Sequence, residues 1–154
     1  MKFLILYVLL FAFGFMNAQQ TQVDSAQTIV QKYYNNDLSD SLRKEYKAKI
    51  AHMDKYIAQD SVNPKAFLQR GVYYGLLGLS VEAISDYDIA IKLNDNQPIA
   101  YFNRALAKAR FRYSYDACYD LKKAYILGLD QANKIFNSYC NLYKTKINQE
   151  VSSN

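Results

Sequence analysis

The stretch PKAFLQRGVYYGLLGLSVEAISDYDIAIKLNDN, residues 64–96, aligns without a gap with PIAYFNRALAKARFRYSYDACYDLKKAYILGLD, residues 98–130. The shift between them is 34 residues, and similar residue types recur at matching places along both stretches. A repeat of this length is typical of proteins built from stacked copies of one small unit. The matches are Pro64 with Pro98, Ala66 with Ala100, Phe67 with Tyr101, Arg70 with Arg104, Gly71 with Ala105, Ser80 with Ser114, Ala83 with Ala117, Asp86 with Asp120 and Ala90 with Ala124.

Each unit carries the signals of two helices joined by a turn. Pro64 and Pro98 stand where a first helix would begin, because proline has no N–H group to leave unpaired there. Ser80 and Ser114 stand where an N-cap side chain would accept a hydrogen bond from the start of a second helix. The small residues among the matches allow two helices to cross closely. The pattern therefore predicts a helix, a turn and a second helix in each unit.

The two units resemble tetratricopeptide repeats. The second unit departs from the family pattern, since Lys108, Arg112 and Leu121 replace an aromatic residue, a glycine and an aromatic residue. The resemblance implies an all-α fold, a short right-handed α-solenoid of helix-turn-helix repeats over residues 64–97 and 98–131 with capping helices at its ends. The residues of the first unit that carry the resemblance are Phe67, Gly71, Tyr74, Gly78, Ala83, Tyr87 and Ala90.

The register of the repeats extends toward the N-terminus. Residues 39–63 are predicted to form a capping or half-repeat helix, because their apolar residues have helical spacing. Residues 19–38 are expected to be a polar segment with a short helix over about 24–36. The apolar residues of the longer helix are Ile50, Met53, Tyr56 and Ile57.

Residues 1–18 have the pattern of a secretory signal peptide. Lys2 precedes an uncharged apolar run over residues 3–15, and Ala18 marks the expected cleavage site. Cleavage would leave an exported protein, in the periplasm of a Gram-negative bacterium or secreted. The alternative is an uncleaved membrane anchor, although the run would span only about 20 Å as a helix, less than the ~30 Å hydrocarbon core.

Toward the C-terminus, residues 132–147 are predicted to form one helix that covers the last repeat, since a solenoid must close its open apolar end. Residues 148–154 are polar and are expected to form a disordered tail. Cys118 and Cys140 would lie on consecutive antiparallel helices. Their repeat positions place one at the helix interface and one nearer the groove, so a disulfide and two separate thiols both remain open.

The composition argues against metal and catalytic chemistry. The 154 residues include 19 Lys+Arg and 14 Asp+Glu, a formal charge of +5, and 51% are apolar, which predicts a packed core. His52 and two cysteines are too few for an ordinary zinc site. The sequence has neither a calcium-binding loop nor a glycine-rich nucleotide loop. We therefore expect no catalytic residue, no metal and no cofactor. Nucleic acid is not an expected partner, because basic residues form no run longer than a pair.

The resemblance implies a concave groove lined by the first helices of the units. Its register places an apolar row at Leu68, Phe102 and Phe136. Beside it runs a row of amides, Gln69, Asn103 and Asn137, which can both donate to and accept from a peptide backbone. The alternative is that the two phenylalanines belong to the core and the amides are only solvated.

Two pairs of opposite charge recur in the units. Arg70 with Asp86, and Arg104 with Asp120, have the same separation of 16 residues. A structural ion pair that ties the two helices of a unit together is favoured over a contact with a charged ligand, because scaffolding predicts duplication.

These observations predict a non-enzymatic module that binds a peptide segment or a protein through its groove. One alternative is a structural envelope protein that associates with itself. Another is a small-ligand binder or enzyme on a repeat scaffold, which the missing acid, base and nucleophile disfavour.

Overall fold

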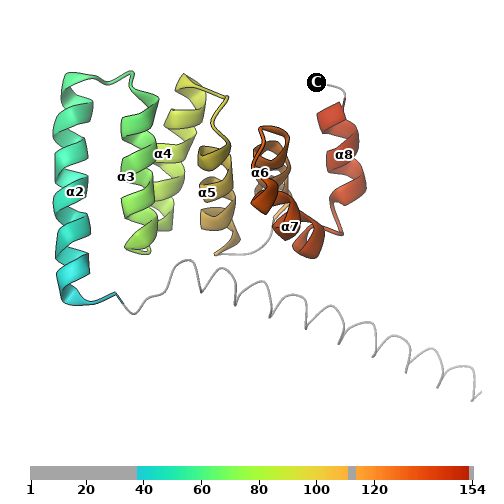
Figure 1. Ribbon diagram of the computed structural model, residues 1–154, viewed down its shortest axis with the longest axis horizontal. Helices are drawn as coiled ribbons and strands as arrows, with labels where there is room; N and C mark the ends of the chain where they lie inside the picture. Colours follow the sequence, from blue (N-terminus) through green and yellow to red (C-terminus); the bar gives the residue numbers. More distant parts are fainter. Residues whose placement is uncertain (1–37, 111–113, 153–154) are drawn as a thin grey trace, which may run out of the picture.

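The computed structural model describes residues 38–110 and 114–152, and over this part of the chain it consists of helices and turns without strands (Figure 1). The expected signal peptide (residues 1–18) and the short helix expected over residues 24–36 lie outside the described residues. The all-α prediction is confirmed. The helices are α2 (Asp40–Gln59), α3 (Pro64–Leu76), α4 (Ser80–Leu93), α5 (Pro98–Ala109), α6 (Tyr115–Ile126), α7 (Asp130–Tyr139) and α8 (Lys144–Ser152).

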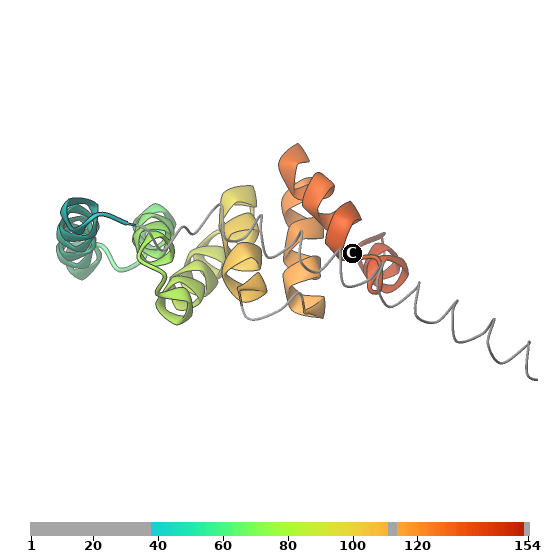
Figure 2. The same cartoon turned by 90° about the horizontal axis from the view of Figure 1, so that it is seen from below.

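The helices pack mainly on their neighbours in the chain. Each helix from α2 to α6 contacts the next one along the sequence, and α8 returns to pack on α6. Seen from below, they follow one another in chain order along the long axis, from α2 at one end to α8 at the other (Figure 2). The fold is therefore an elongated row of helices, whose sides form extended surfaces along the long axis.

The residues that begin and end the helices match the sequence signals in part. Pro64 opens α3 and Pro98 opens α5, and Ser114 accepts a hydrogen bond from the backbone N–H of Ala117 at the start of α6. Ser80 differs from its prediction, because it is the buried first residue of α4 and makes no cap hydrogen bond. Gly78 has a φ of 80° in the turn between α3 and α4, a conformation that favours glycine.

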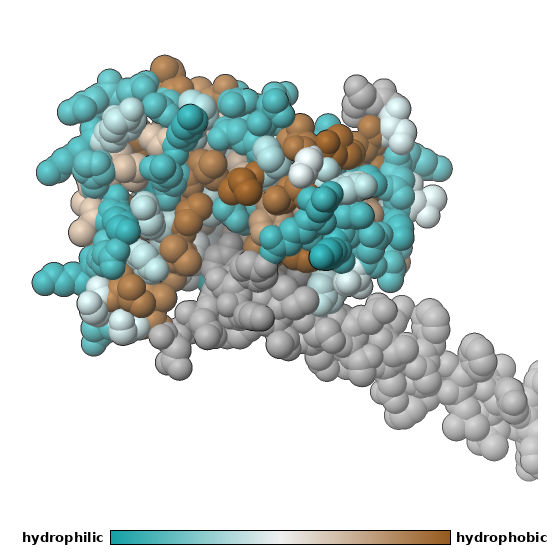
Figure 3. All heavy atoms as spheres, in the orientation of Figure 1, coloured by the Kyte–Doolittle hydropathy of each residue, from teal (hydrophilic) through white to brown (hydrophobic). Residues whose placement is uncertain are grey.

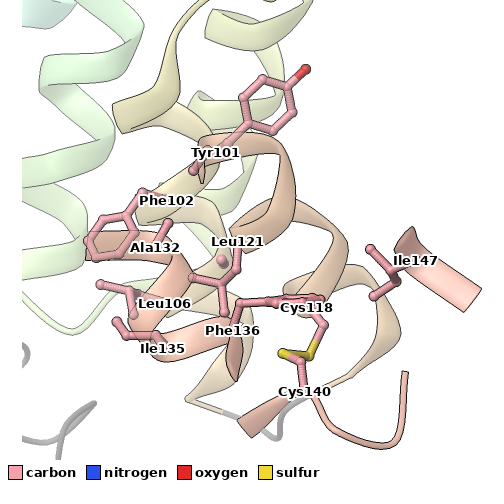
Figure 4. Packing of buried hydrophobic residues seen from close by; sticks show 12 residues of the cluster. Tyr101, Phe102, Leu106, Cys118, Leu121, Ala132, Ile135, Phe136, Cys140 and Ile147 are labelled. Carbon is pink, nitrogen blue, oxygen red and sulfur yellow. A yellow bond between two sulfur atoms is a disulfide. The ribbon is translucent and has the colours of Figure 1, made fainter. Parts of the chain in front are cut away.

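The core is concentrated toward the C-terminal half. The larger cluster joins α5, α6, α7 and α8, and Figure 4 shows its side chains. A smaller cluster holds Tyr87 with Ala83 and Ala107, and Leu68 packs against it. In contrast, α2 has no buried residue, although Tyr46 stacks on Tyr73 of α3. The N-terminal end is therefore the more weakly packed part of the described chain.

Where the two helices of each unit cross, the sizes of the two facing residues compensate each other. At Gly71 an added Cβ would lie 2.7 Å from the ring of Tyr87, so only glycine fits there. At the corresponding positions of the second unit, Ala105 and Leu121 are both buried. A larger residue on the first helix thus accompanies a smaller one on the second.

We expect Gly71→Ala to lower the free energy of unfolding by about 1 to 2 kcal/mol. The clash with Tyr87 costs about 1 to 3 kcal/mol, and the better helix propensity of alanine recovers up to about 1 kcal/mol. Tyr87→Leu in the same chain should remove part of that cost, so urea unfolding of both single variants and the double variant should give a favourable coupling energy. Additive effects would contradict the size matching.

The C-terminal region corrects two predictions. Instead of one helix over residues 132–147, α7 ends at Tyr139 and a turn leads into α8. Instead of a disordered tail, the helix continues to Ser152. The physical reason is that Ile147 is fully buried and Val151 packs against the same cluster one turn later, which fixes α8 on the body.

Polar contacts add to the attachment of α8. Tyr115 on α6 donates a hydrogen bond to the carboxylate of Glu150, and its ring meets that of Tyr143 edge to face. The hydrogen bond to Glu150 is the main reason that the pKa of Tyr115 is raised to about 12. Because the folded pKa lies above the ordinary value of 10.0, this contribution to stability is complete below that pH and is lost as the pH rises through the folded pKa.

We therefore expect the alkaline titration of Tyr115 to have a midpoint near pH 12. The measurement is the phenolate absorbance of the wild type minus that of Tyr115→Phe, with circular dichroism at each pH to confirm that the helices persist. Glu150→Gln should move the midpoint of this difference curve downward. A wild-type midpoint at the ordinary tyrosine pKa would contradict the contact.

Candidate binding surface

Two arginines on first helices connect three helices each. Arg70 on α3 donates from Nε and Nη2 to the carboxylate of Asp86 on α4, at 2.8 and 2.7 Å. Its Nη1 donates to Asp54 on α2 at 2.7 Å. Arg70 therefore joins the second helix of its own unit to the helix that precedes the unit.

The second unit repeats this arrangement. Arg104 on α5 donates from Nε and Nη2 to Asp120 on α6, at 2.9 and 2.6 Å, and from Nη1 to Asp88 on α4 at 2.6 Å. The predicted pairs of Arg70 with Asp86 and of Arg104 with Asp120 are thus confirmed as structural ion pairs. The additional contacts, to Asp54 and to Asp88, were not predicted.

The side chains of Arg104 and Asp120 are slightly more buried than those of Arg70 and Asp86. The side chain of Asp120 is only 2% exposed and accepts a further hydrogen bond from Lys108 Nζ at 2.9 Å. Burial acts to lower the pKa of Arg104, but the hydrogen bonds and charge of Asp120 outweigh it, so the pKa is raised. The hydrogen bond to Asp86 is the main reason that the pKa of Arg70 is also raised. Both guanidinium groups are therefore held in their charged form and are committed to the scaffold.

Cys118 and Cys140 form a disulfide, which settles the alternative that the sequence left open. It joins the first turn of α6 to the residue that ends α7, and both cysteines are fully buried (Figure 4). The expectation that one of them faces a groove is wrong. The disulfide fixes α7 against α6 just before the chain turns toward α8.

The predicted apolar row of the groove is corrected by the structure. Phe102 is 6% exposed and Phe136 is 1% exposed, and both belong to the larger core cluster. Leu68 is half-buried against the smaller cluster. The two phenylalanines cannot take up the side chains of a partner, because they are already packed between α5, α6 and α7.

The amide row has two side chains without a hydrogen-bond partner among the described residues and one that is paired. Gln69 is exposed and Asn103 is half-buried, and neither side chain hydrogen-bonds to another residue that the structure describes. Asn137 is exposed but donates to Asn133 on its own helix. On the face of the molecule in Figure 3, apolar patches lie among hydrophilic residues. A partner would therefore find two free amides, one on α3 and one on α5.

A cavity of about 280 Å³ lies between α2 and α3 and includes one end of this amide row. Sequence reasoning missed the cavity, because the pattern that predicted α2 does not show how far it stands from α3. Met53 and Tyr56 line the cavity and also belong to the apolar pattern that predicted α2. They were the only signal in the sequence that pointed to this place. The cavity is lined by His52, Met53, Tyr56, Asn63, Lys65, Ala66 and Gln69.

The cavity end of this surface carries amide, hydroxyl, imidazole and amine groups beside apolar side chains. Within residues 38–110 and 114–152, no group of three or more His, Cys, Asp and Glu side chains is placed to hold a metal ion. None of the described helices has the length and apolar character needed to cross a membrane. Searches of protein-family models, curated proteins and solved structures give no match to the chain.

Proposed function

We propose that the chain is a non-enzymatic binding module of tetratricopeptide-type repeats that holds a peptide segment or protein along α3 and α5. The observation that carries the proposal is the pair of amides Gln69 and Asn103, which have no hydrogen-bond partner among the described residues. Gln69 also lines a cavity. An amide of this kind can pair with both the C=O and the N–H of an extended backbone.

The repeat architecture of the proposal is supported by the ion pairs. A tetratricopeptide-type array stacks equivalent units, so equivalent residues should meet equivalent neighbours. Arg70 and Arg104 each contact one aspartate 16 residues before and one 16 residues after them. The same separations in two successive units are what a regular stack of helix pairs requires.

The disulfide supports an exported location. A buried disulfide forms and persists in an oxidising compartment and is rare in the cytosol of mesophilic cells. Together with the signal-peptide pattern of residues 1–18, it favours the periplasm or secretion. In such a compartment a small module without catalytic residues would act through the partner that it holds.

The affinity of such a surface is limited. Two hydrogen bonds at about 0.5 to 1.5 kcal/mol each contribute about 1 to 3 kcal/mol, whereas a micromolar complex needs about 8 kcal/mol. Since Phe102 and Phe136 are buried in the core, the remainder must come from half-buried residues such as Leu68 and from the cavity. We therefore expect a dissociation constant in the micromolar range or weaker.

The experiment is a selection of short random peptides displayed on phage against the mature chain with its disulfide intact. We expect enriched peptides whose affinity falls about 5- to 150-fold in the double variant Gln69→Ala, Asn103→Ala, because two backbone hydrogen bonds are lost. Asn96→Ala, in the exposed turn between α4 and α5, is the matched control and should bind like the wild type.

Two results would contradict the proposal. The first is a folded wild type that retains no peptide. The second is retention unchanged by the double variant while circular dichroism shows both proteins folded. Light scattering on the same samples tests the alternative of self-association, which a monomer at high micromolar concentration excludes.

A further inference from the structure

The side chains that line the cavity between α2 and α3 include hydrogen-bond donors but no carboxylate. Of the residues that line it, His52, Tyr56, Asn63, Lys65 and Gln69 carry N–H or O–H groups, whereas Met53 and Ala66 are apolar. None of the lining residues is an aspartate or a glutamate. The cavity can therefore offer several hydrogen-bond donors and one fixed positive charge, Lys65, to a group that enters it.

The hydrogen bonds around the cavity leave donors available. Asn63 donates from Nδ2 to the hydroxyl oxygen of Tyr56 and to Asp60. Because the Tyr56 oxygen accepts this bond, its own proton is available for another acceptor. The side-chain oxygen of Asn63 accepts from the backbone N–H of Lys65, so the start of α3 is already capped and the side chains are the donors that remain.

The nearby carboxylates are already engaged. Asp54 on α2 pairs with Arg70, and Asp60 accepts from Asn63 and from the backbone N–H of Val62. Lys65 is exposed and forms no ion pair with a carboxylate of the described residues. The ammonium group of Lys65 thus has no ion-pair partner in the described part of the chain.

We propose that this cavity binds the carboxylate of an acidic side chain, aspartate or glutamate, of a peptide that lies along α3 and α5. The inference rests on the proposed function and adds a specificity to it. Gln69 belongs both to the lining and to the amide row, so a peptide held by the amides would have a side chain at the cavity mouth. A volume of about 280 Å³ lies just below the range for small-molecule sites and suits a single side chain.

The probes are a peptide enriched in the selection above, in a form with glutamate and a form with glutamine at the same position. For the wild type we expect the glutamate form to bind about tenfold more tightly, since charge-assisted hydrogen bonds are about twice as strong as neutral ones. For Lys65→Gln we expect the two forms to bind nearly equally. Lys55→Gln, an exposed lysine of α2 that does not line the cavity, makes the same change of net charge and should keep the preference.

Each other outcome decides against the inference. Enriched peptides without an acidic position, or a preference that survives Lys65→Gln, would overturn the carboxylate site and leave the proposed function standing. A folded wild type that retains no peptide would contradict both. Displacement of the peptide by free glutarate as effectively as by unlabelled peptide would assign the cavity to small carboxylates instead of a peptide side chain.

Discussion

Asp120→Ala is expected to lower the free energy of unfolding by about 3 kcal/mol. The carboxylate of Asp120 accepts two hydrogen bonds from Arg104 and one from Lys108, and its side chain is 2% exposed. Removing one partner of a buried ion pair costs about 3 to 5 kcal/mol, because the charge that remains has lost its compensation. We expect the lower end of this range, since the side chain of Arg104 is still 16% exposed and water can reach part of its charge.

Asp88→Ala is the matched control, because it removes the other carboxylate from the same arginine. Asp88 accepts from Arg104 Nη1 at 2.6 Å, but its side chain is 55% exposed. An exposed ion pair contributes about 0 to 1 kcal/mol, so the loss should be small. Urea unfolding followed by circular dichroism measures both variants with the disulfide oxidised. Losses of equal size would show that burial is not what gives Asp120 its importance.

By the same reasoning, the buried ion pair of the first unit should contribute less to stability than that of the second unit. Asp86 is buried and accepts from Arg70, whereas Asp120 also accepts from Lys108. Asp86→Ala therefore removes the buried partner of one positive charge, and Asp120→Ala removes the buried partner of two. We expect the smaller loss for Asp86→Ala in the same unfolding experiment, and the reverse order would contradict the assignment of Lys108 to this network.

The ion pairs were predictable because they depend on spacing alone. A helix hairpin of fixed length brings residues 16 apart to the same level, and the repetition of Arg70 with Asp86 and Arg104 with Asp120 made chance unlikely. The contacts with Asp54 and Asp88 follow the same spacing in the other direction. They were missed because α2 was considered as a cap, although its register already placed Asp54 one repeat before Asp88.

The groove was predicted less well, for a physical reason. A first helix in a row of helices has an apolar stripe whether that stripe meets a partner or the next helix. Phe102 and Phe136 are buried because α7, held by the disulfide, packs with α5 and α6 into one cluster. Gln69 and Asn103, which follow Leu68 and Phe102 in the chain, are exposed and half-buried. They stay in contact with water because burying an unpaired amide costs free energy.

The C-terminal helices also show that a periodic apolar pattern does not determine which residues become buried. Apolar residues with helical spacing continue from Ile135 to Ile147, so the pattern alone favoured one helix. The pattern cannot show that a turn after Cys140 brings Ile147 back onto α6, where it is fully buried. Burial by a returning chain is a tertiary effect that a single periodic stripe does not encode.

Removal of the disulfide, by Cys118→Ala with Cys140→Ala, is expected to lower the free energy of unfolding by about 3 kcal/mol. The cysteines are 22 residues apart. A link that closes a loop of this length restricts the unfolded chain by about 3 kcal/mol. Both residues are changed together because a single substitution would leave a reactive thiol. Urea unfolding of the oxidised wild type and the double variant gives the difference.

The location of the disulfide adds a second expectation to this experiment. Since both cysteines are fully buried, a reductant should reach the bond only when the chain opens. The rate of reduction in the native protein should then level off at the rate of opening as the concentration of reductant rises. Hydrogen exchange should show loss of protection first in α7 and α8, because α8 is attached mainly to α6 and follows the link in the chain. A double variant as stable as the wild type, with unchanged protection in α7 and α8, would show that the link does not hold the C-terminal helices on the body.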